Sequence, residues 1–379
     1  MNGNRRVLFY SDLTRPFVPS DLDHRPLGGS ETALVRVTRG LAAAGWSVVV
    51  AAHPQDRAGS YNGVEFLNVD DETWRSADPH VVIVFRQLPH ALRRLPGSIR
   101  VLWAHDHIGI YPEMPPGIRR AALGMGWRLA YPLFGRRAPM IVAVSEWLRS
   151  CFVQYARWPD SAVCAIGNAI EPAFFSQSDH DTPRNGSFRV AYTSVPERGL
   201  ALLVEQIMPL IWRSIPEVEL HAFSYQPLDR YRSLQTSANR VIFRGGLRQP
   251  ELARELTRFD LWLYPTDFPE TSCIAAMEAQ AAGVPVITSR RFALTETVQD
   301  RQTGVLIDGP VGSHEYVQQF AMAAIDLLKD QERRARMGRQ ARERMLAEFT
   351  WDKAVKNWDE LLRQIVTRDF VPRSQSCEA

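Results

Sequence analysis

Residues 264–289 read YPTDFPETSCIAAMEAQAAGVPVITS, and this stretch decides the fold. The apolar run that ends at Tyr264 predicts one strand, and the VPVITS run predicts another. Between them lie a polar loop with Glu270 and a predicted helix, which begins near Thr271 or Ser272 and carries Glu278 about two turns inside it. A strand, a helix and a second strand in this order are typical of a parallel sheet covered by helices.

The same alternation continues on both sides of this stretch and predicts two Rossmann-like, doubly wound α/β domains. Apolar runs predict strands at 6–10, 47–52, 81–85, 101–104 and 140–144, and again at 188–194, 218–224, 241–245, 260–265 and 284–289. Residues 171–187 are rich in Pro, Ser, Asp and Asn, as linkers are. We predict domains at 1–172 and 188–352, a linker at 173–187, and a C-terminal helix and tail at 353–379.

Composition excludes several classes of protein. The 379 residues carry 45 basic and 42 acidic side chains, a formal net charge of +3, so no overall field favours nucleic acid as a partner. The four cysteines lie far apart without a CxxC pair, which argues against a zinc site or a disulfide framework. No signal-peptide pattern or membrane span is recognised, and we expect a cytoplasmic protein.

The predicted helix after Glu270 has the properties of an anion site. Free backbone amides at its start, with the helix dipole behind them, favour a phosphate or sugar hydroxyls beside Thr271 and Ser272. At ~1.5 Å per residue, Glu278 lies about 9 Å along the helix from Ser272. This separation suits one carboxylate on a hexose and one on a ribose, with a diphosphate between them.

With this E-x7-E pattern, the chain resembles the retaining family 4 of glycosyltransferases (glycosyl transferases group 1), from about Val7 to residues 349–351. The resemblance implies the GT-B architecture, in which an N-terminal acceptor-binding domain and a C-terminal nucleotide-sugar-binding domain face each other across a cleft. It implies that the C-terminal helix crosses back to the N-terminal domain. It also implies that Glu270 contacts the donor sugar and that Glu278 holds the ribose hydroxyls.

Further segments carry the resemblance toward the donor phosphates. The Gly28-Gly29 pair matches the family's glycine-rich loop after the first strand, where backbone amides approach the phosphate. Arg198 falls where the family has a phosphate-binding lysine, and a guanidinium binds two phosphate oxygens at once. An earlier arginine of the family pattern is missing, and Thr193 or Ser194 occupies that stretch.

Two other positions follow from the resemblance. His105, or His107 as the alternative, ends the strand VLWA, where the family has a histidine beside the donor sugar and the reaction centre. Gly245 lies in the segment VIFRGG, which resembles the strand and loop that meet the base through backbone groups. We therefore predict catalytic roles for Glu270, Arg198 and His105.

The function implied is transfer of a hexose-type sugar from a nucleotide sugar, with UDP- or GDP-sugars favoured, to a hydroxyl acceptor with retention. The acceptor is a glycan, a lipid-linked molecule or a small molecule, and no cofactor or metal is expected. One rival is a GT-B epimerase or phosphorylase, although the only lysines, Lys329, Lys353 and Lys356, are poorly placed for pyridoxal phosphate. The other rival is a non-catalytic module that binds a sugar nucleotide or glycan.

Residues 114–138 form a candidate membrane-facing segment. No acidic residue occurs between Glu113 and Glu146, and five arginines are interleaved there with aromatic and apolar residues. Such a stretch suits peripheral contact with anionic lipid at the inner face of the membrane. The alternative is an arginine-rich helix on the acceptor side.

Overall fold

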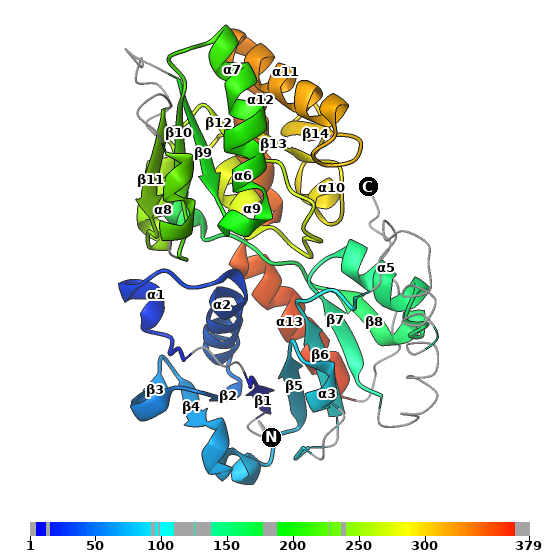
Figure 1. Ribbon diagram of the computed structural model, residues 1–379. Helices are drawn as coiled ribbons and strands as arrows, with labels where there is room; N and C mark the ends of the chain where they lie inside the picture. The colour runs from blue at the N-terminus through cyan, green and yellow to red at the C-terminus, as the bar shows by residue number, and fades with distance from the viewer. Residues whose placement is uncertain are drawn as a thin grey trace. The chain divides into compact units, whose positions relative to one another are not determined.

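The computed structural model describes residues 5–12, 16–91, 95–97, 99–109, 125, 138–176, 188–226, 228–235 and 240–367. The chain divides into two compact units (Figure 1). Unit 1 comprises Met1–Asp21, Gly29–Asn168 and Trp351–Ala379, and unit 2 comprises Leu22–Gly28 and Ala169–Thr350. The candidate membrane segment 114–138 lies, except for residues 125 and 138, outside the described residues.

The sheet of unit 1 has the strand order β3-β4-β2-β1-β5-β6-β7-β8, in which only β3 is antiparallel to its neighbour. Its strands are β1 (Arg6–Tyr10), β2 (Ser47–Ala52), β3 (Gly59–Tyr61), β4 (Val64–Asn68), β5 (Val81–Phe85), β6 (Ile99–Ala104), β7 (Met140–Ala143) and β8 (Val163–Ala165). The central strands are apolar runs because both of their faces are buried. The edge strands β3 and β8, and β4 next to β3, have no such run, and the sequence pattern missed them.

The helices of unit 1 include α2 (Gly29–Ala43), α3 (Leu88–Ala91), α5 (Glu146–Gln154) and α13 (Trp351–Val366), while α1 (Asp21–His24) lies where the chain passes into unit 2. The predicted return of the C-terminal helix to the N-terminal domain is confirmed. Val355 of α13 packs against Gly40 of α2, where a Cβ would come within 2.4 Å of it. Asp359 accepts a hydrogen bond from the Trp46 indole at 2.7 Å.

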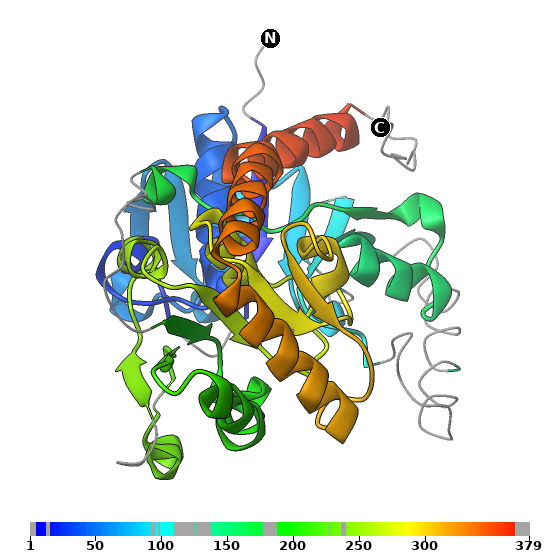
Figure 2. The ribbon, with the colours of Figure 1, turned by 90° about the horizontal axis from the view of Figure 1, so that it is seen from above.

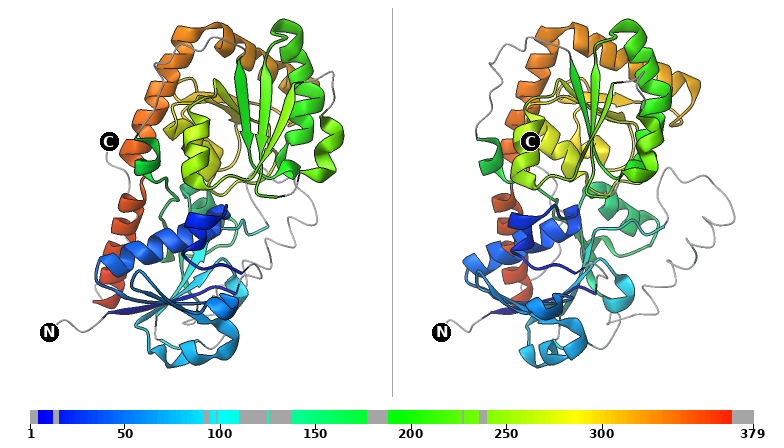
Figure 3. Two further views of the ribbon diagram at one scale, coloured as in Figure 1. Left: turned by 90° about the vertical axis from the view of Figure 1, so that its left-hand side faces the viewer. Right: turned by 60° about the vertical axis from the view of Figure 1, so that its left-hand side comes forward.

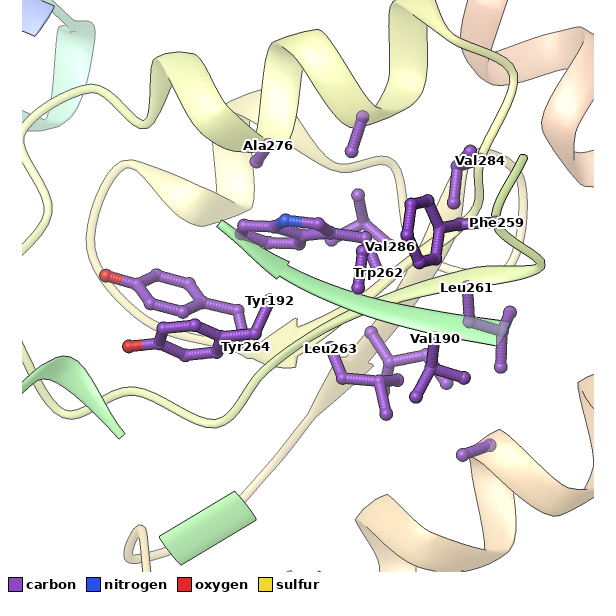
Figure 4. Packing of buried hydrophobic residues seen from close by; sticks show 14 of the residues in the cluster. Val190, Tyr192, Phe259, Leu261, Trp262, Leu263, Tyr264, Ala276, Val284 and Val286 are labelled. Carbon is purple, nitrogen blue, oxygen red and sulfur yellow. The ribbon is translucent and has the colours of Figure 1, made fainter. Parts of the chain in front are cut away.

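Unit 2 contains a parallel sheet of order β11-β10-β9-β12-β13-β14. The strands are β9 (Arg189–Thr193), β10 (Glu219–Phe223), β11 (Val241–Gly245), β12 (Leu261–Tyr264), β13 (Val286–Ser289) and β14 (Gly304–Ile307). Figure 3 shows helices on both faces of this sheet. Its core gathers side chains of the central strands β9 and β12 (Figure 4).

The helices of unit 2 are α6 (Leu200–Leu202), α7 (Met208–Ser214), α8 (Gln249–Leu256), α9 (Ile274–Ala281), α10 (Leu294–Thr297), α11 (His314–Lys329) and α12 (Gln331–Glu348). A π-helical turn, Leu203–Ile207, joins α6 to α7. Pro209 follows at the start of α7 and has no N–H to donate into a regular α-helical ladder. Residues 200–214 are therefore helical throughout but irregular.

The arginines of α12 make contacts that the basic sequence of this helix does not predict. A basic run such as residues 331–345 is typical of a solvated face, but several of its arginines donate to backbone carbonyls of neighbouring elements. Arg342 donates to the carbonyl of Ala281 at 2.7 Å, and Arg344 to that of Thr297 at 2.8 Å. These bonds provide donors to carbonyls at the ends of helices α9 and α10. Figure 2 follows α11 and α12 in orange, one after the other.

The domain limits at 172, 188 and 352 remain a prediction, and the structure divides into the two compact units given above. Within the part of the chain that the structure describes, no helix combines the length and the apolar character that crossing a lipid bilayer requires.

Candidate functional site

The connection of strands in unit 2 creates a ligand-binding position between β9 and β12. From β9 the chain proceeds to β10 and β11 on one side, and then crosses to β12, β13 and β14 on the other. The loops after β9 and β12 therefore diverge at neighbouring strand ends, which is where open α/β sheets bind ligands. The first loop carries Arg198 and the second carries Glu270, so the fold brings these two predicted residues together.

Glu270 is buried and accepts two hydrogen bonds on a single oxygen. Its Oε1 atom accepts from Nη1 of Arg198 at 2.9 Å and from the Tyr264 hydroxyl at 2.5 Å. Burial raises the pKa of the Glu270 carboxyl, while Arg198 and Tyr264 oppose this rise. Among the described residues no donor reaches Oε2, which leaves this oxygen able to accept from a ligand hydroxyl.

Glu270 and Phe268 hold the Arg198 side chain, which keeps further N–H donors for a ligand. It pairs with Glu270, and its guanidinium carbon lies 3.7 Å from the ring centroid of Phe268. Burial lowers the pKa of Arg198, but Glu270 and Tyr264 raise it by more, so the guanidinium stays charged. Only one of its five N–H groups is used on Glu270. The others are available to an anion.

Gly199 allows the two loops to meet. It has φ +120°, a conformation that L side chains rarely adopt, and a Cβ there would lie 2.1 Å from the carbonyl oxygen of Pro265. The turn Pro196–Arg198 is thus packed directly against the backbone that follows β12. A larger residue at position 199 would require this turn or the Pro265 backbone to shift.

Glu278 lies on α9 and meets α8. Its Oε1 accepts from the Gln249 amide at 2.9 Å, where Gln249 is the first residue of α8. Burial raises the pKa of Glu278 to about 7, opposed by the Gln249 hydrogen bond. This partly buried carboxylate is therefore near its midpoint of ionisation at neutral pH.

The helix that carries Glu278 begins later than the sequence predicted. We expected its start near Thr271 or Ser272, but α9 begins at Ile274. The Glu270 carbonyl accepts from the Ala293 amide at 3.1 Å, and the first helical bond runs from Met277 to the Cys273 carbonyl at 3.2 Å. No side chain caps this helix start, and its amides remain suited to an anion.

Thr193 and Ser194, the predicted donor-binding pair, have partners within the protein. The Thr193 hydroxyl accepts from the Trp262 indole at 2.8 Å, and Ser194 donates to the Tyr264 hydroxyl at 3.3 Å. Their hydroxyls are therefore part of the support around Tyr264, and their contact with a phosphate stays a prediction.

A pocket of about 640 Å³ opens at the ends of β10 and β11. Gly245, predicted to meet the base, has φ +69° and lines this pocket with Gly246. Further lining residues are Ser224, Tyr225, Gln226, Leu228, Asp229, Arg232, Gln235 and Phe243. The segment that contains Gly28 reaches the same part of unit 2, because Pro26 approaches Gly246 and Arg248 donates to the Asp23 carbonyl at 2.7 Å.

Gly29 and the two histidines belong to unit 1. Gly29 is the first residue of α2. His105 is 6% exposed, and its ring lies 4.7 Å from that of Phe85 and 4.8 Å from that of Trp103. Burial, with a smaller contribution from Arg86, lowers the pKa of His105 well below its ordinary value, so this imidazole is neutral. Burial also lowers the pKa of His107. Their roles toward the donor stay predictions.

The sequence by itself does not single out Tyr264, Gln249, Phe268 or Gly199. Tyr264 stands in the stretch that decided the fold, but nothing local shows that a strand-end tyrosine will meet Glu270. Gln249 lies 29 positions from its partner Glu278. In the described part of the chain, no group of three or more His, Cys, Asp or Glu side chains is placed to hold a metal ion.

Residues 188–330 match the family model described as "Glycosyl transferases group 1". The chain is similar to a GDP-mannose-dependent alpha-(1-6)-phosphatidylinositol monomannoside mannosyltransferase of Mycobacterium tuberculosis, 32% identical over 179 residues, covering 45% of each chain. The Mycolicibacterium smegmatis protein of the same name is 27% identical over 266 residues, 63% of this chain and 67% of that one. The match thus spans about half the length of the first relative.

Solved structures share the fold. Sucrose-phosphate synthase from Thermosynechococcus elongatus superimposes with a TM-score of 0.72 at 18% identity, covering 96% of this chain and all of that one. Anabaena HepE in complex with UDP-glucose gives a TM-score of 0.69 at 18% identity, covering 95% and 99%. At such identities the likeness establishes the two-sheet GT-B fold alone.

Proposed function

We propose that the chain is a group 1 glycosyltransferase, as the family-model match over residues 188–330 supports, and that it transfers a hexose-type sugar from a nucleoside diphosphate sugar to a hydroxyl acceptor with retention. The observation that carries this proposal is the Arg198–Glu270 pair at the switch point of the unit 2 sheet. A cation for a diphosphate and a carboxylate for sugar hydroxyls stand side by side where this fold binds ligands.

The proposed mechanism centres on the charge of the leaving group. As the bond between the sugar and the phosphate breaks, negative charge develops on the nucleoside diphosphate. The N–H groups of Arg198 that do not bind Glu270 and the uncapped amides at the start of α9 would neutralise this charge without a metal ion. Oε2 of Glu270 would accept a hydrogen bond from a sugar hydroxyl. The departing phosphate would take the proton of the acceptor hydroxyl, which attacks from the leaving-group face.

The remainder of the donor would bind to the same unit. Glu278 would accept hydrogen bonds from the ribose hydroxyls, and the pocket at Gly245 and Gly246 would hold the base. The mannosyltransferases to which the chain is similar are named for GDP-mannose, and the HepE structure holds UDP-glucose. These names support GDP- or UDP-sugars as the donor.

The acceptor side of the proposal concerns unit 1. A glycan, a lipid-linked molecule or a small molecule would bind in unit 1, with His105 beside the reaction centre and Gly28 and Gly29 at the phosphates. The relatives named for a phosphatidylinositol mannoside support a lipid-linked acceptor. Peripheral membrane contact through residues 114–138 belongs to this proposal, and co-sedimentation with anionic vesicles at low salt tests it.

The experiment is a screen of UDP-, GDP-, ADP- and dTDP-sugars by thermal shift, followed by hydrolysis of the bound donor without acceptor. A ligand at 100 times its Kd stabilises the folded state by ~2.7 kcal/mol, which is readily detected. Slow release of the nucleotide supports a transferase. Binding without turnover favours a sugar-nucleotide-binding module, and an altered sugar still attached to its nucleotide favours an epimerase.

Two substitutions then test the site. Glu270→Ala and Arg198→Ala should each lower turnover by ~10²–10³, as the loss of one charge-assisted contact to a developing charge does. Arg258→Ala and Glu348→Gln are the matched controls, because these exposed side chains pair only on the outside of unit 2. Near-normal turnover in both site variants, with the controls unchanged, would refute the proposed site.

A further inference from the structure

We propose that Tyr264 is a positioning residue for sugar transfer: its hydroxyl holds Oε1 of Glu270 so that Oε2 is presented to the donor sugar. This inference rests on the proposed function of Glu270 as a sugar-binding carboxylate. It assigns a role to a side chain that itself touches no substrate and acts only through Glu270.

The position of Tyr264 is rigid. The residue ends β12, has no exposed surface, and packs its ring 5.8 Å from Tyr192 and 5.0 Å from Trp262. Figure 4 shows the rings of Tyr192 and Tyr264 side by side with both hydroxyls at the same end of the cluster. Because the ring is held in this way, the position of its hydroxyl is defined, and the hydroxyl oxygen lies 2.5 Å from Oε1 of Glu270.

The Tyr264 hydroxyl joins a directed chain of hydrogen bonds. Ser194 donates to it at 3.3 Å, and it donates in turn to Oε1 of Glu270. Successive bonds of this kind polarise and strengthen one another. Burial raises the pKa of Tyr264 well above its ordinary value, so the phenol remains protonated and donates at any pH where the protein works.

Two donors on one oxygen define how the carboxylate is turned. Arg198 alone would allow Glu270 to rotate or to offer either oxygen, whereas Arg198 and Tyr264 together occupy Oε1 from two directions. The titratable groups facing Glu270 are Arg198, Tyr264, Tyr192 and Cys273. Only the first two donate to its carboxylate and so favour the ionised form against the effect of burial.

The test is Tyr264→Phe, which removes the hydroxyl and keeps the ring. Donor hydrolysis is measured from pH 5 to 9.5 with UDP-glucose or GDP-mannose, whichever the wild type turns over. Because the active form is the carboxylate, activity rises with pH through the pKa of Glu270. The acid limb is the part of the pH–activity curve in which activity rises with pH. Losing a hydrogen bond to a charged group should shift this limb to higher pH by about one unit and leave the activity on the alkaline plateau nearer to the wild-type value.

Tyr316→Phe is the matched control. Tyr316 is also a buried tyrosine of unit 2, but its hydroxyl bonds to Ser289 at 2.8 Å rather than to Glu270. The control should lose stability without moving the acid limb. An unmoved limb in Tyr264→Phe, or an equal movement in both variants, would overturn the inference.

A second probe keeps the test decisive if Tyr264→Phe does not fold. Replacing Tyr264 by 3-fluorotyrosine retains the ring and the hydroxyl but makes the phenol a stronger donor, so the acid limb should move down. An unmoved limb here also overturns the inference. A wild type that turns over no nucleotide sugar fails the proposed function itself, whereas an active wild type with an unmoved limb fails only the role of Tyr264.

Discussion

Replacing Gln249 by leucine should weaken nucleotide binding at neutral pH and leave it almost unchanged at pH 9.5. The Gln249 amide is the donor that opposes the effect of burial on Glu278, whose pKa is about 7. A hydrogen bond to a charged group contributes about 1.5–3 kcal/mol, and one pKa unit corresponds to 1.36 kcal/mol. Because Glu278 is only partly buried, we take the lower end, a rise of about one unit.

The consequence for binding follows from the ionised fraction. At pH 7 about half of the Glu278 carboxyls are ionised in the wild type, against roughly one in eleven in the variant. If the carboxylate is the form that accepts the ribose hydroxyls, affinity at pH 7 should fall about fivefold. Well above both pKa values the two proteins should bind alike.

Isothermal titration calorimetry with UDP or GDP, from pH 6 to 9.5, measures this difference. Gln249→Glu extends the series, because a second carboxylate beside Glu278 should raise its pKa further and weaken binding more. A loss of affinity that is equal at every pH would show that Gln249 acts by packing alone. Wild-type binding that does not change between pH 6 and 8 would remove Glu278 from the ribose site.

Two further changes have effects that stability measurements detect. Glu278→Gln should raise the Tm of the unliganded protein at pH 8 but not at pH 4: the folded pKa is raised from 4.5 to about 7, so the wild type loses stability as pH rises between these values, at most about 3 kcal/mol. An equal Tm for both proteins at pH 8 contradicts this. Gly199→Ala should lower the free energy of unfolding by more than Gly309→Ala, since both glycines have positive φ but only position 199 meets a carbonyl, that of Pro265. Urea unfolding compares the two, and equal losses would mean that the contact with Pro265 is unimportant.

The sequence indicated the buried centre of each sheet. Strands such as β5 and β12 are covered on both faces, so they are continuous apolar runs that can be recognised without their neighbours. The strands β3 and β14 were missed because they lie at sheet edges and are only three and four residues long. Their strand character comes from pairing with a neighbour, which a single sequence pattern does not contain.

The candidate site, too, could be predicted from the sequence only in part. Spacing and resemblance picked out Glu270, Glu278 and Arg198, because each stands at a recognisable place after a strand or on a helix. The predicted start of α9 was early, since the bond from Ala293 to the Glu270 carbonyl joins two loops 23 positions apart and keeps the chain out of the helix. Local propensity does not register such a bond.

By itself, then, the sequence determined the class of fold and the types of residue at the strand ends, since both depend on the order of apolar and polar residues along the chain. Only the tertiary structure decided that Arg198 and Tyr264 share one oxygen of Glu270 and that Gln249 holds Glu278. These contacts join elements that the β9–β12 crossover brings side by side, and the carboxylates take their raised pKa values from burial that exists only after folding.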